Sequence, residues 1–277
     1  MWNKIVDMWN KIVDWFKSLF GGGYHSFDKF ADPSKPFMGY GLVNNWSAQN
    51  ADSYMEKLVK NNVQCMAFEF FEWATPDKFA AVDNLLKKFE KYVIGAKKRK
   101  LLLYVTILNS NIGSGKYGDP GIPSNKYTTQ IMKVADKLAS WMKSNKNIFV
   151  TPCGEGGAQS KMASHDKKFQ EYCKSIMPRS QMVNNWGSRP DSTDGMAYLC
   201  QHPAKTTSPC KSWVMSDHGL LIAELNGGGL YGNCSYAITM PYAKKLKKAN
   251  KAFIYYHFNK NGSIDMEALR SLDDAQK

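Results

Sequence analysis

The sequence predicts an α/β protein whose main domain is a (β/α)8 TIM-type barrel, partly degenerate around strands five to seven. Two observations lead to this prediction. Short segments rich in β-branched and aromatic residues alternate with longer segments of helical periodicity, which is typical of parallel strands covered by helices. Between Phe37 and Asn259 there are eight such β-rich segments, the number that this barrel requires.

The composition bounds the class of protein. The chain has 277 residues, of which 43% are hydrophobic and 13% aromatic, and this favours a folded globular protein. The net charge of +13 is typical of a basic soluble surface, or of attraction to an anionic lipid surface, an acidic polysaccharide or nucleic acid. No nucleic-acid motif accompanies the charge, so nucleic acid is not favoured as a partner. No run of eighteen apolar residues predicts a membrane-spanning helix.

Residues 1–20 predict a separate amphipathic helix. The segment Met1–Asp7 is repeated without change as Met8–Asp14, and its apolar residues fall at helical spacing. Charged residues interrupt it throughout, so it does not have the form of a secretory signal. A hinge and linker follow over residues 21–36. The helix has three expected roles: a lid on the barrel, an anchor in a membrane surface, or a docking element for a larger assembly.

The barrel is expected over residues 37–277. A helix is expected from the N-cap Ser47 to Asn61, and another begins at Pro76, directly after Thr75. Further helices are expected over 127–144, 164–175, 236–250 and 264–276. The expected strands, in chain order, are Phe37–Asn45, Val63–Trp73, Leu101–Asn109, Ile148–Glu155, Gln181–Trp186, Gly195–Cys200, Gly219–Asn226 and Ala252–Asn259.

Two connections depart from a regular barrel. Only Gly187–Thr193 separate the fifth and sixth strands, too few residues for a crossover helix. The next connection, His202–Asp217, is rich in Pro and Ser and has little helical periodicity. A doubly wound open sheet is the alternative fold, but no glycine-rich phosphate fingerprint accompanies it.

Cysteines and lysines add local expectations. Cys65 and Cys153 lie in predicted strands and are expected to be buried thiols. Among Cys200, Cys210 and Cys234, near predicted loops, one disulfide can form. No CxxC pair and no His and Asp cluster is present, so we expect neither a metal nor a cofactor. The run Lys97–Lys100 is expected to end a helix at the surface.

Residues suited to sugar binding recur at the predicted carboxyl ends of the strands, where function collects in this fold. Amides and carboxylates form hydrogen bonds with sugar hydroxyls, and indole rings stack on the apolar faces of pyranose rings. A strand-end Asn can also simply turn the chain, but Trp recurs here together with Asn or Glu. The expected substrate contacts are Asn44, Trp46, Glu69, Glu72, Trp73, Asn109, Asn184, Asn185, Trp186, His202, Asn226, Tyr256 and His257.

Glu155 and Glu224 are the expected catalytic residues. Each follows an apolar strand, the fourth and the seventh, and each is followed by glycines that let a ligand approach the backbone closely. A carboxylate in such a place is costly unless it is paired or used. Glycoside hydrolysis needs two carboxyl groups that flank the scissile bond. Salt bridges with nearby Lys or Arg are the structural alternative, and Glu69 and Glu72 are spare carboxylates.

These positions resemble the large clan of retaining (β/α)8 glycoside hydrolases, in which the acid/base Glu ends strand four and the nucleophile Glu ends strand seven. The resemblance implies that Glu155 is the acid/base and Glu224 the nucleophile. The clan usually has Asn before the acid/base, where this chain has Gly154. The clan often has Trp at the end of strand eight, where this chain offers Tyr256 and His257.

The expected function is therefore hydrolysis of a polysaccharide or glycan by a retaining two-carboxylate mechanism, so the chain is expected to be an O-glycosyl hydrolase. The alternative is a non-catalytic carbohydrate-binding or structural barrel, anchored to a virion, membrane or cell-surface assembly by residues 1–20. Another barrel enzyme, such as a lyase or metal-dependent hydrolase, is a third reading. A location outside the cell, at a cell surface or on a virion fits the first two.

Overall fold

The computed structural model describes the greater part of the chain between residues 25 and 274. The described residues are 25–33, 35, 37–42, 50–71, 76–109, 127–154, 164–186, 198–201, 220–222, 244, 247–248, 252–257, 264, 266, 269–270 and 273–274. The predicted helix over residues 1–20 therefore lies outside them and stays a prediction. Among the helices that are described, none has both the length and the apolar character needed to cross a bilayer.

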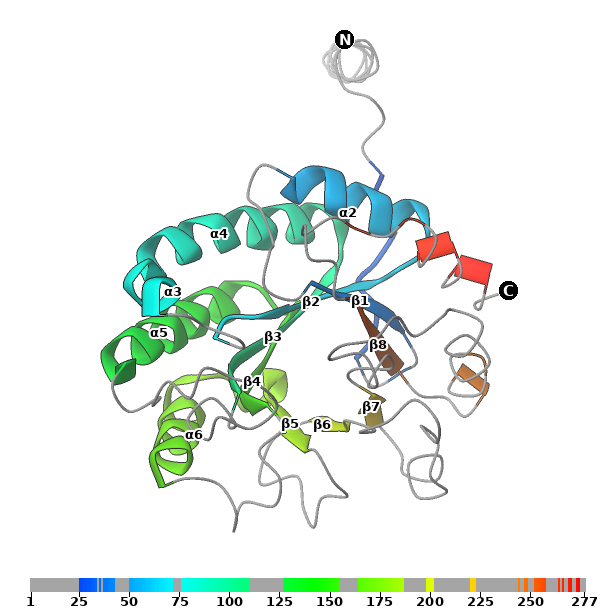
Figure 1. The fold of residues 1–277 in the computed structure, drawn as a ribbon. Coiled ribbons are helices and arrows are strands. Elements are labelled where there is room, and N and C mark those ends of the chain that lie inside the picture. Colours follow the sequence, from blue (N-terminus) through cyan, green and yellow to red (C-terminus); the bar gives the residue numbers. More distant parts are fainter. Residues whose placement is uncertain are drawn as a thin grey trace, which may run out of the picture.

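Eight parallel strands form one sheet in the order β4-β3-β2-β1-β8-β7-β6-β5 (Figure 1). Each strand therefore lies beside its neighbour in the chain, and the first strand pairs with the last, as in a (β/α)8 barrel. All eight lie where the sequence predicts a strand. Their bounds are β1 Met38–Leu42, β2 Cys65–Glu69, β3 Leu102–Asn109, β4 Ile148–Gly154, β5 Val183–Trp186, β6 Tyr198–Gln201, β7 Leu220–Ile222 and β8 Ala252–His257.

Helices cover one face of this sheet (Figure 1). The longer described helices show apolar residues at helical spacing on their buried side, such as Leu86, Phe89 and Val93 of α4. The helix bounds are α2 Ala51–Lys60, α3 Pro76–Ala80, α4 Val82–Arg99, α5 Thr128–Ser144, α6 Ser164–Ile176 and a short 3-10 helix, Arg179–Gln181.

Three details of the helices differ from the sequence predictions. Helix α2 begins at Ala51 and not at Ser47, and its N-cap Asn50 makes no side-chain capping bond. The helix that starts at Pro76, as predicted, is divided at Ala81 into α3 and α4. The predicted surface run Lys97–Lys100 holds one buried member, since Arg99 is 5% exposed and donates to Asp52 Oδ1 at 2.9 Å.

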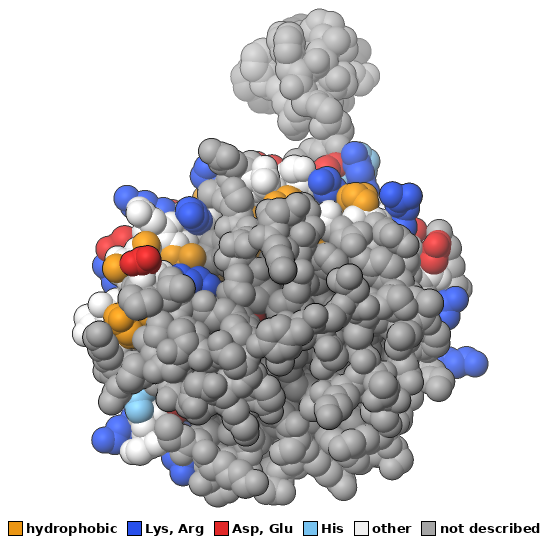
Figure 2. Space-filling model, in the orientation of Figure 1, with side chains coloured by type: hydrophobic (Ala, Val, Ile, Leu, Met, Phe, Trp, Pro, Cys, Tyr) orange, Lys and Arg blue, Asp and Glu red, His pale blue; other side chains and the backbone are white. Residues whose placement is uncertain are grey.

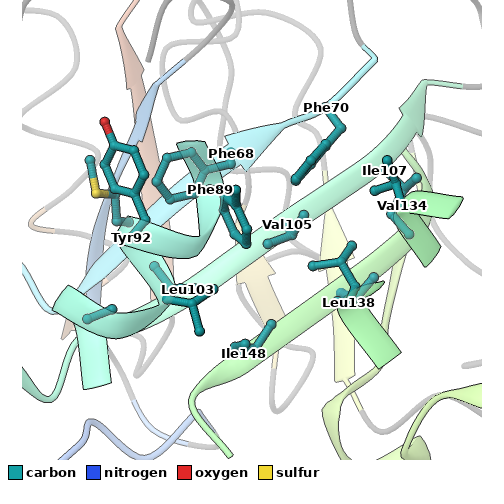
Figure 3. Close-up of a cluster of buried hydrophobic side chains, with 14 of the residues drawn as sticks. Phe68, Phe70, Phe89, Tyr92, Leu103, Val105, Ile107, Val134, Leu138 and Ile148 are labelled. Carbon is teal, nitrogen blue, oxygen red and sulfur yellow. The ribbon is translucent and has the colours of Figure 1, made fainter. Parts of the chain in front are cut away.

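The outer face of the sheet packs on the helices through a large apolar cluster. The ring of Phe68 on β2 meets the rings of Phe89 and Tyr92 on α4 edge-on, at centroid distances of 5.1 and 4.8 Å (Figure 3). Such pairs add about 0.5–1.5 kcal/mol to the stabilisation from burial. Val105 and Ile148 on the neighbouring strands belong to the same cluster.

A second apolar cluster consists of strand residues and Phe37, which directly precedes β1, and it contains no helix residue, so it marks the enclosed face, the face of the sheet opposite the helices. Cys65 and Ala67 belong to it, whereas Met66 and Phe68 belong to the outer cluster, as the alternation along a strand requires. The inner cluster consists of Phe37, Cys65, Ala67, Leu102, Tyr104, Phe149, Val183, Ala252 and Ile254, all buried.

The two ends of the strand order, β4 and β5, are joined by one isolated parallel bridge, between Val150 and Met182. Pro152 in β4 has no amide hydrogen, so it cannot donate to a ladder. Instead the hydroxyl of Thr151 donates to the carbonyl of Val183 at 2.5 Å. Beside the Val150–Met182 bridge, the seam between β4 and β5 is therefore held by side-chain hydrogen bonds, including one from Nε2 of Gln181 to the carbonyl of Ile148 at 2.9 Å.

Candidate functional site

The carboxyl ends of the eight parallel strands point to one end of the sheet. The helices that follow β2, β3 and β4 begin at that end, so the first turns of α3, α5 and α6 lie there too. We call this end the mouth, and the opposite end, where the strands begin, the basal face.

The two expected catalytic glutamates lie outside the described residues, but the strands before them are described. Glu155 comes directly after Gly154, the last residue of β4, and Glu224 comes two residues after Ile222, the last residue of β7. These strands are the fourth and seventh of the sheet, as expected. Also outside the described residues are Asn44, Trp46, Glu72, Trp73, His202 and Asn226.

Five other expected contacts have a described backbone at the mouth ends of strands. The pairing places Asn109 beside Gly154, and it places Tyr256 and His257 beside Gly41 and Leu42 of β1. The remaining two, Asn185 and Trp186, end β5 beside Cys200 and Gln201 of β6.

Glu69 is an expected site residue whose side chain is described. It ends β2 and lies two residues beyond Ala67 of the inner cluster, so the alternation of the strand places its carboxyl group on the same enclosed face. It is only 4% exposed. A buried carboxylate at the mouth end of an apolar strand is costly in water-free surroundings and therefore indicates use or pairing.

Two threonines lie in register with Glu69. Thr106 of β3 pairs with Glu69, and Thr151 of β4 pairs with Thr106. Both are buried, and each lies two residues after an inner-cluster residue, Tyr104 or Phe149, so both are on the same face as that cluster. Together Glu69, Thr106 and Thr151 form what we call the polar layer, which lies one step toward the mouth from the apolar inner cluster.

Lys78 brings a positive charge to the same place. It lies in the short helix α3, is partly buried, and interacts electrostatically with Glu69. Burial lowers the pKa of the Lys78 amine to about 8, and the Glu69 carboxylate opposes that shift. Because its pKa lies near neutrality, Lys78 exchanges a proton more readily than an ordinary lysine does.

Asn184 lies elsewhere. It is buried and follows Val183 of the inner cluster, so the alternation of β5 places it on the face opposite that cluster. Glu69 therefore lies on the enclosed face, and Asn184 lies on the opposite face of the sheet.

A second polar group joins the first turns of α5 and α6. The hydroxyl of Thr128 lies 2.9 Å from Nε2 of His165, and Nδ1 of His165 lies 3.4 Å from the buried carboxylate of Asp166. The backbone carbonyl of Asp166 accepts from the thiol of Cys153 on β4. Burial, reinforced by Asp166, raises the pKa of that thiol and keeps it neutral.

Lys78, Thr106 and Thr151 were not predicted from the sequence as site residues. The two threonines carry a usable signal, since each is an even number of residues from an inward apolar position, Tyr104 or Phe149. Lys78 carries none, because one lysine among many in a surface helix has no distinguishing pattern. Among the described residues no group of three His, Cys, Asp or Glu side chains could hold a metal ion.

Solved structures resemble this chain in fold. The endoglucanase Cel5A of Pseudomonas stutzeri matches with a TM-score of 0.57 and 10% identity over 91% of this chain and 96% of its own. The endo-1,4-beta-mannanase of Rhizomucor miehei matches with 0.54 and 12% identity over 92% and 99%. The cellulose synthase subunit Z of Clostridioides difficile matches with 0.54 and 10% identity over 87% and 99%.

No protein-family model and no curated protein sequence matches the chain. At 10–12% identity, the likeness concerns the fold alone. The chain has an α/β fold that resembles that of the (β/α)8 glycoside hydrolases.

Proposed function

We propose that the chain is a glycoside hydrolase of the retaining type, built on a complete (β/α)8 barrel, that cleaves a polysaccharide or glycan. The observation that supports this proposal is the position of two glutamates in the chain, one directly after β4 and one two residues after β7, the fourth and seventh strands of the sheet. Parallel strands end at the mouth, where we propose that both residues lie, and the fold resembles that of an endoglucanase and an endomannanase.

In this proposal Glu155 is the acid/base and Glu224 the nucleophile. Glu224 attacks the anomeric carbon while Glu155 protonates the leaving oxygen, and a covalent glycosyl-enzyme forms. Glu155, now a carboxylate, then takes a proton from a water molecule. The water oxygen attacks the anomeric carbon, the Glu224 carboxylate leaves, and the sugar is released with retained configuration. A separation of about 5 Å between the two carboxyl groups is what this chemistry requires.

The polar layer supplies the floor of the proposed site. The buried Glu69 carboxylate can accept hydrogen bonds from sugar hydroxyls, and Thr106 lies beside it in register. The charge of Lys78 interacts with that of Glu69 and adds a cationic group beside this carboxyl. The strand-end Trp and Asn residues expected from the sequence are proposed as the walls.

A direct test uses the full chain on a panel of soluble β-glucans, mannans and aryl glycosides. We expect Glu224→Ala to abolish hydrolysis of every substrate, because no covalent intermediate can form. Glu155→Ala should lose activity on polysaccharides but retain the first step on an aryl glycoside, whose leaving group needs no proton. Undiminished activity of Glu224→Ala would refute the nucleophile assignment.

Gly154 favours one second candidate function, a barrel that binds carbohydrate without cleaving it. Gly154 ends β4 where the retaining clan usually has Asn, so a contact to the sugar 2-hydroxyl has to come from elsewhere. Binding of an oligosaccharide by the wild type, with no products after long incubation and unchanged affinity in Glu224→Gln, would assign the chain to this function.

A further inference from the structure

The basal face is rich in exposed lysines. Helices α4 and α5 end there, with Lys97 and Lys98 in the last turn of α4 and Lys143 in the last turn of α5. Lys97 Nζ lies 3.5 Å from the carbonyl of Ser144, so the two helix ends are adjacent. Lys29, Lys100 and Lys146 join them, since Lys100 Nζ donates to the carbonyl of Asp28 and Lys146 precedes β4.

Among the described residues, none of these six lysines forms an ion pair with a carboxylate, although the exposed Asp28 is next to Lys29 in the chain. Two lysines nearer the mouth on α5 do form ion pairs, Lys133 with Asp83 at 2.6 Å and Lys137 with Glu90 at 4.0 Å. The described surface in Figure 2 shows Lys and Arg side chains along both sides of the view.

Part of the charge has an ordinary explanation. Basic residues in the last turn of a helix stabilise the carbonyl end of the helix dipole, and Lys97, Lys98 and Lys143 are so placed. That explanation does not cover Lys29 and Lys146, which lie outside helices. Beside Lys29, Phe30 is 39% exposed, one of two large hydrophobic residues exposed in the described part of the chain.

The N-terminal segment joins the barrel at this same face. The amide of Phe27 donates to the carbonyl of Arg99 at the end of α4, and His25 contacts Glu56 near the end of α2. The chain before residue 25 contains the repeated MWNKIVD segment, whose Met, Trp, Ile and Val residues alternate at helical spacing with Lys, Asn and Asp. Such a segment has the composition of a helix that lies in a membrane interface.

We propose that the basal face binds an anionic lipid bilayer, as a second contact beside the N-terminal segment, so that the mouth points away from the membrane. Residues 25–27, which follow that segment in the chain, lie at the basal face, and the lysines there add electrostatic attraction to the burial of apolar side chains. A lysine near an anionic surface contributes on the order of 1 kcal/mol. A bilayer explains the exposed Phe30 better than an acidic polymer does, because an aromatic ring can enter the headgroup region.

The test compares two double charge reversals in the full chain. Lys98→Glu/Lys146→Glu changes the basal face, and Lys167→Glu/Lys168→Glu changes an exposed pair in the first turn of α6, at the mouth. Each alters the net charge by the same amount. Binding is measured by co-sedimentation with vesicles of phosphatidylcholine alone and of phosphatidylcholine with phosphatidylglycerol. Thermal unfolding checks that both variants fold.

We expect the wild type to prefer the vesicles that contain phosphatidylglycerol. The basal variant should bind these vesicles at least about tenfold more weakly than the wild type, and the mouth variant should bind them within about threefold of the wild type. Equal losses in both variants would show an effect of net charge alone and overturn the proposal. So would no loss in the basal variant, or no vesicle binding by the wild type. Loss of binding to a soluble acidic polysaccharide, with vesicle binding intact, would assign the face to a polymer instead.

Discussion

At the scale of single residues, the enclosed face of the sheet leaves no spare volume at Gly39. A Cβ at this position would lie 2.9 Å from Cγ1 of Ile254 and 3.2 Å from Cβ of Cys65, which belong to the two strands that flank β1. Both contacts are with atoms close to the backbone, so neither neighbour can move away without shifting a strand.

We therefore expect Gly39→Ala to lower the free energy of unfolding by about 1–3 kcal/mol. Gly95→Ala is the matched control. A Cβ there meets Cε of Met55, the far end of a flexible side chain that can turn away, and alanine also favours the α4 helix by about 1 kcal/mol. Urea denaturation of both variants measures the difference. A larger loss for Gly95→Ala than for Gly39→Ala would contradict the packing described for the inner cluster.

Lys78 predicts a pH dependence of stability. Its folded pKa is lowered to about 8, so between about pH 8 and its ordinary value of 10.5 the unfolded chain holds the proton and the folded chain does not. The folded state therefore gains stability as the pH rises through that window. Because Lys78 is only partly buried, we expect a gain of about 1–2 kcal/mol.

Lys78→Met removes the titrating group and serves as the reference. The difference in unfolding free energy between wild type and Lys78→Met, from urea melts at pH 7.5 and 10.5, should shift in favour of the wild type by that amount. Buried thiols and phenols titrate in both proteins and cancel in the comparison. A difference that does not vary with pH would show that Lys78 is solvated.

At the scale of elements, the five-residue helix α3 packs on its neighbours through the ring of Phe79. Phe79 stacks on Phe71, just beyond β2, at a centroid distance of 4.5 Å and on Tyr127, just before α5, at 4.1 Å. The stack thus ties α3 to both neighbours. It also fixes the position of Lys78, the residue before Phe79.

Phe79→Ala should destabilise the chain by about 3–5 kcal/mol, since it removes a fully buried ring and leaves a cavity. Phe79→Leu keeps most of the volume and should cost markedly less. Thermal or urea unfolding gives both values. If the two substitutions cost the same, the stacked geometry and not the volume stabilises α3.

Elements were the part of the fold that the sequence predicted best, for a physical reason. Each strand is a short apolar run bounded by turn residues, and each of α4, α5 and α6 carries an apolar stripe, so local pattern and tertiary burial agree. The burial of Arg99 was not predicted, since it depends on a neighbour distant in sequence, Asp52, and the break at Ala81 was not predicted either. For the site, strand ends were predictable from position, whereas Lys78 depends on how α3 docks.

At the scale of the whole molecule, the two ends of the strand order, β4 and β5, meet at a seam beside a proline. The hydroxyl of Thr151 bonds to the carbonyl of Val183 beside Pro152, which can donate nothing. Thr151→Val keeps the shape of the side chain but leaves that buried carbonyl without its donor, a loss of about 1–3 kcal/mol.

Hydrogen exchange locates this effect. In Thr151→Val we expect faster amide exchange in β5 than in β2, while Thr151→Ser, which keeps the hydroxyl, should preserve the wild-type pattern. Equal acceleration in β2 and β5 would indicate global destabilisation and not an opening of the seam.

The pairing of β1 with β8 has a consequence for how the chain is made. Met38 pairs with Phe253, about 215 residues later, so one edge of the first strand has no partner until the last strand has been synthesised. At typical rates of translation that interval lasts roughly 10–40 s. During it, the free edge of β1 can pair with other nascent chains, and the long sequence separation also slows refolding from denaturant. Productive folding of this protein therefore depends on timing, and slow growth at low temperature should raise the soluble yield.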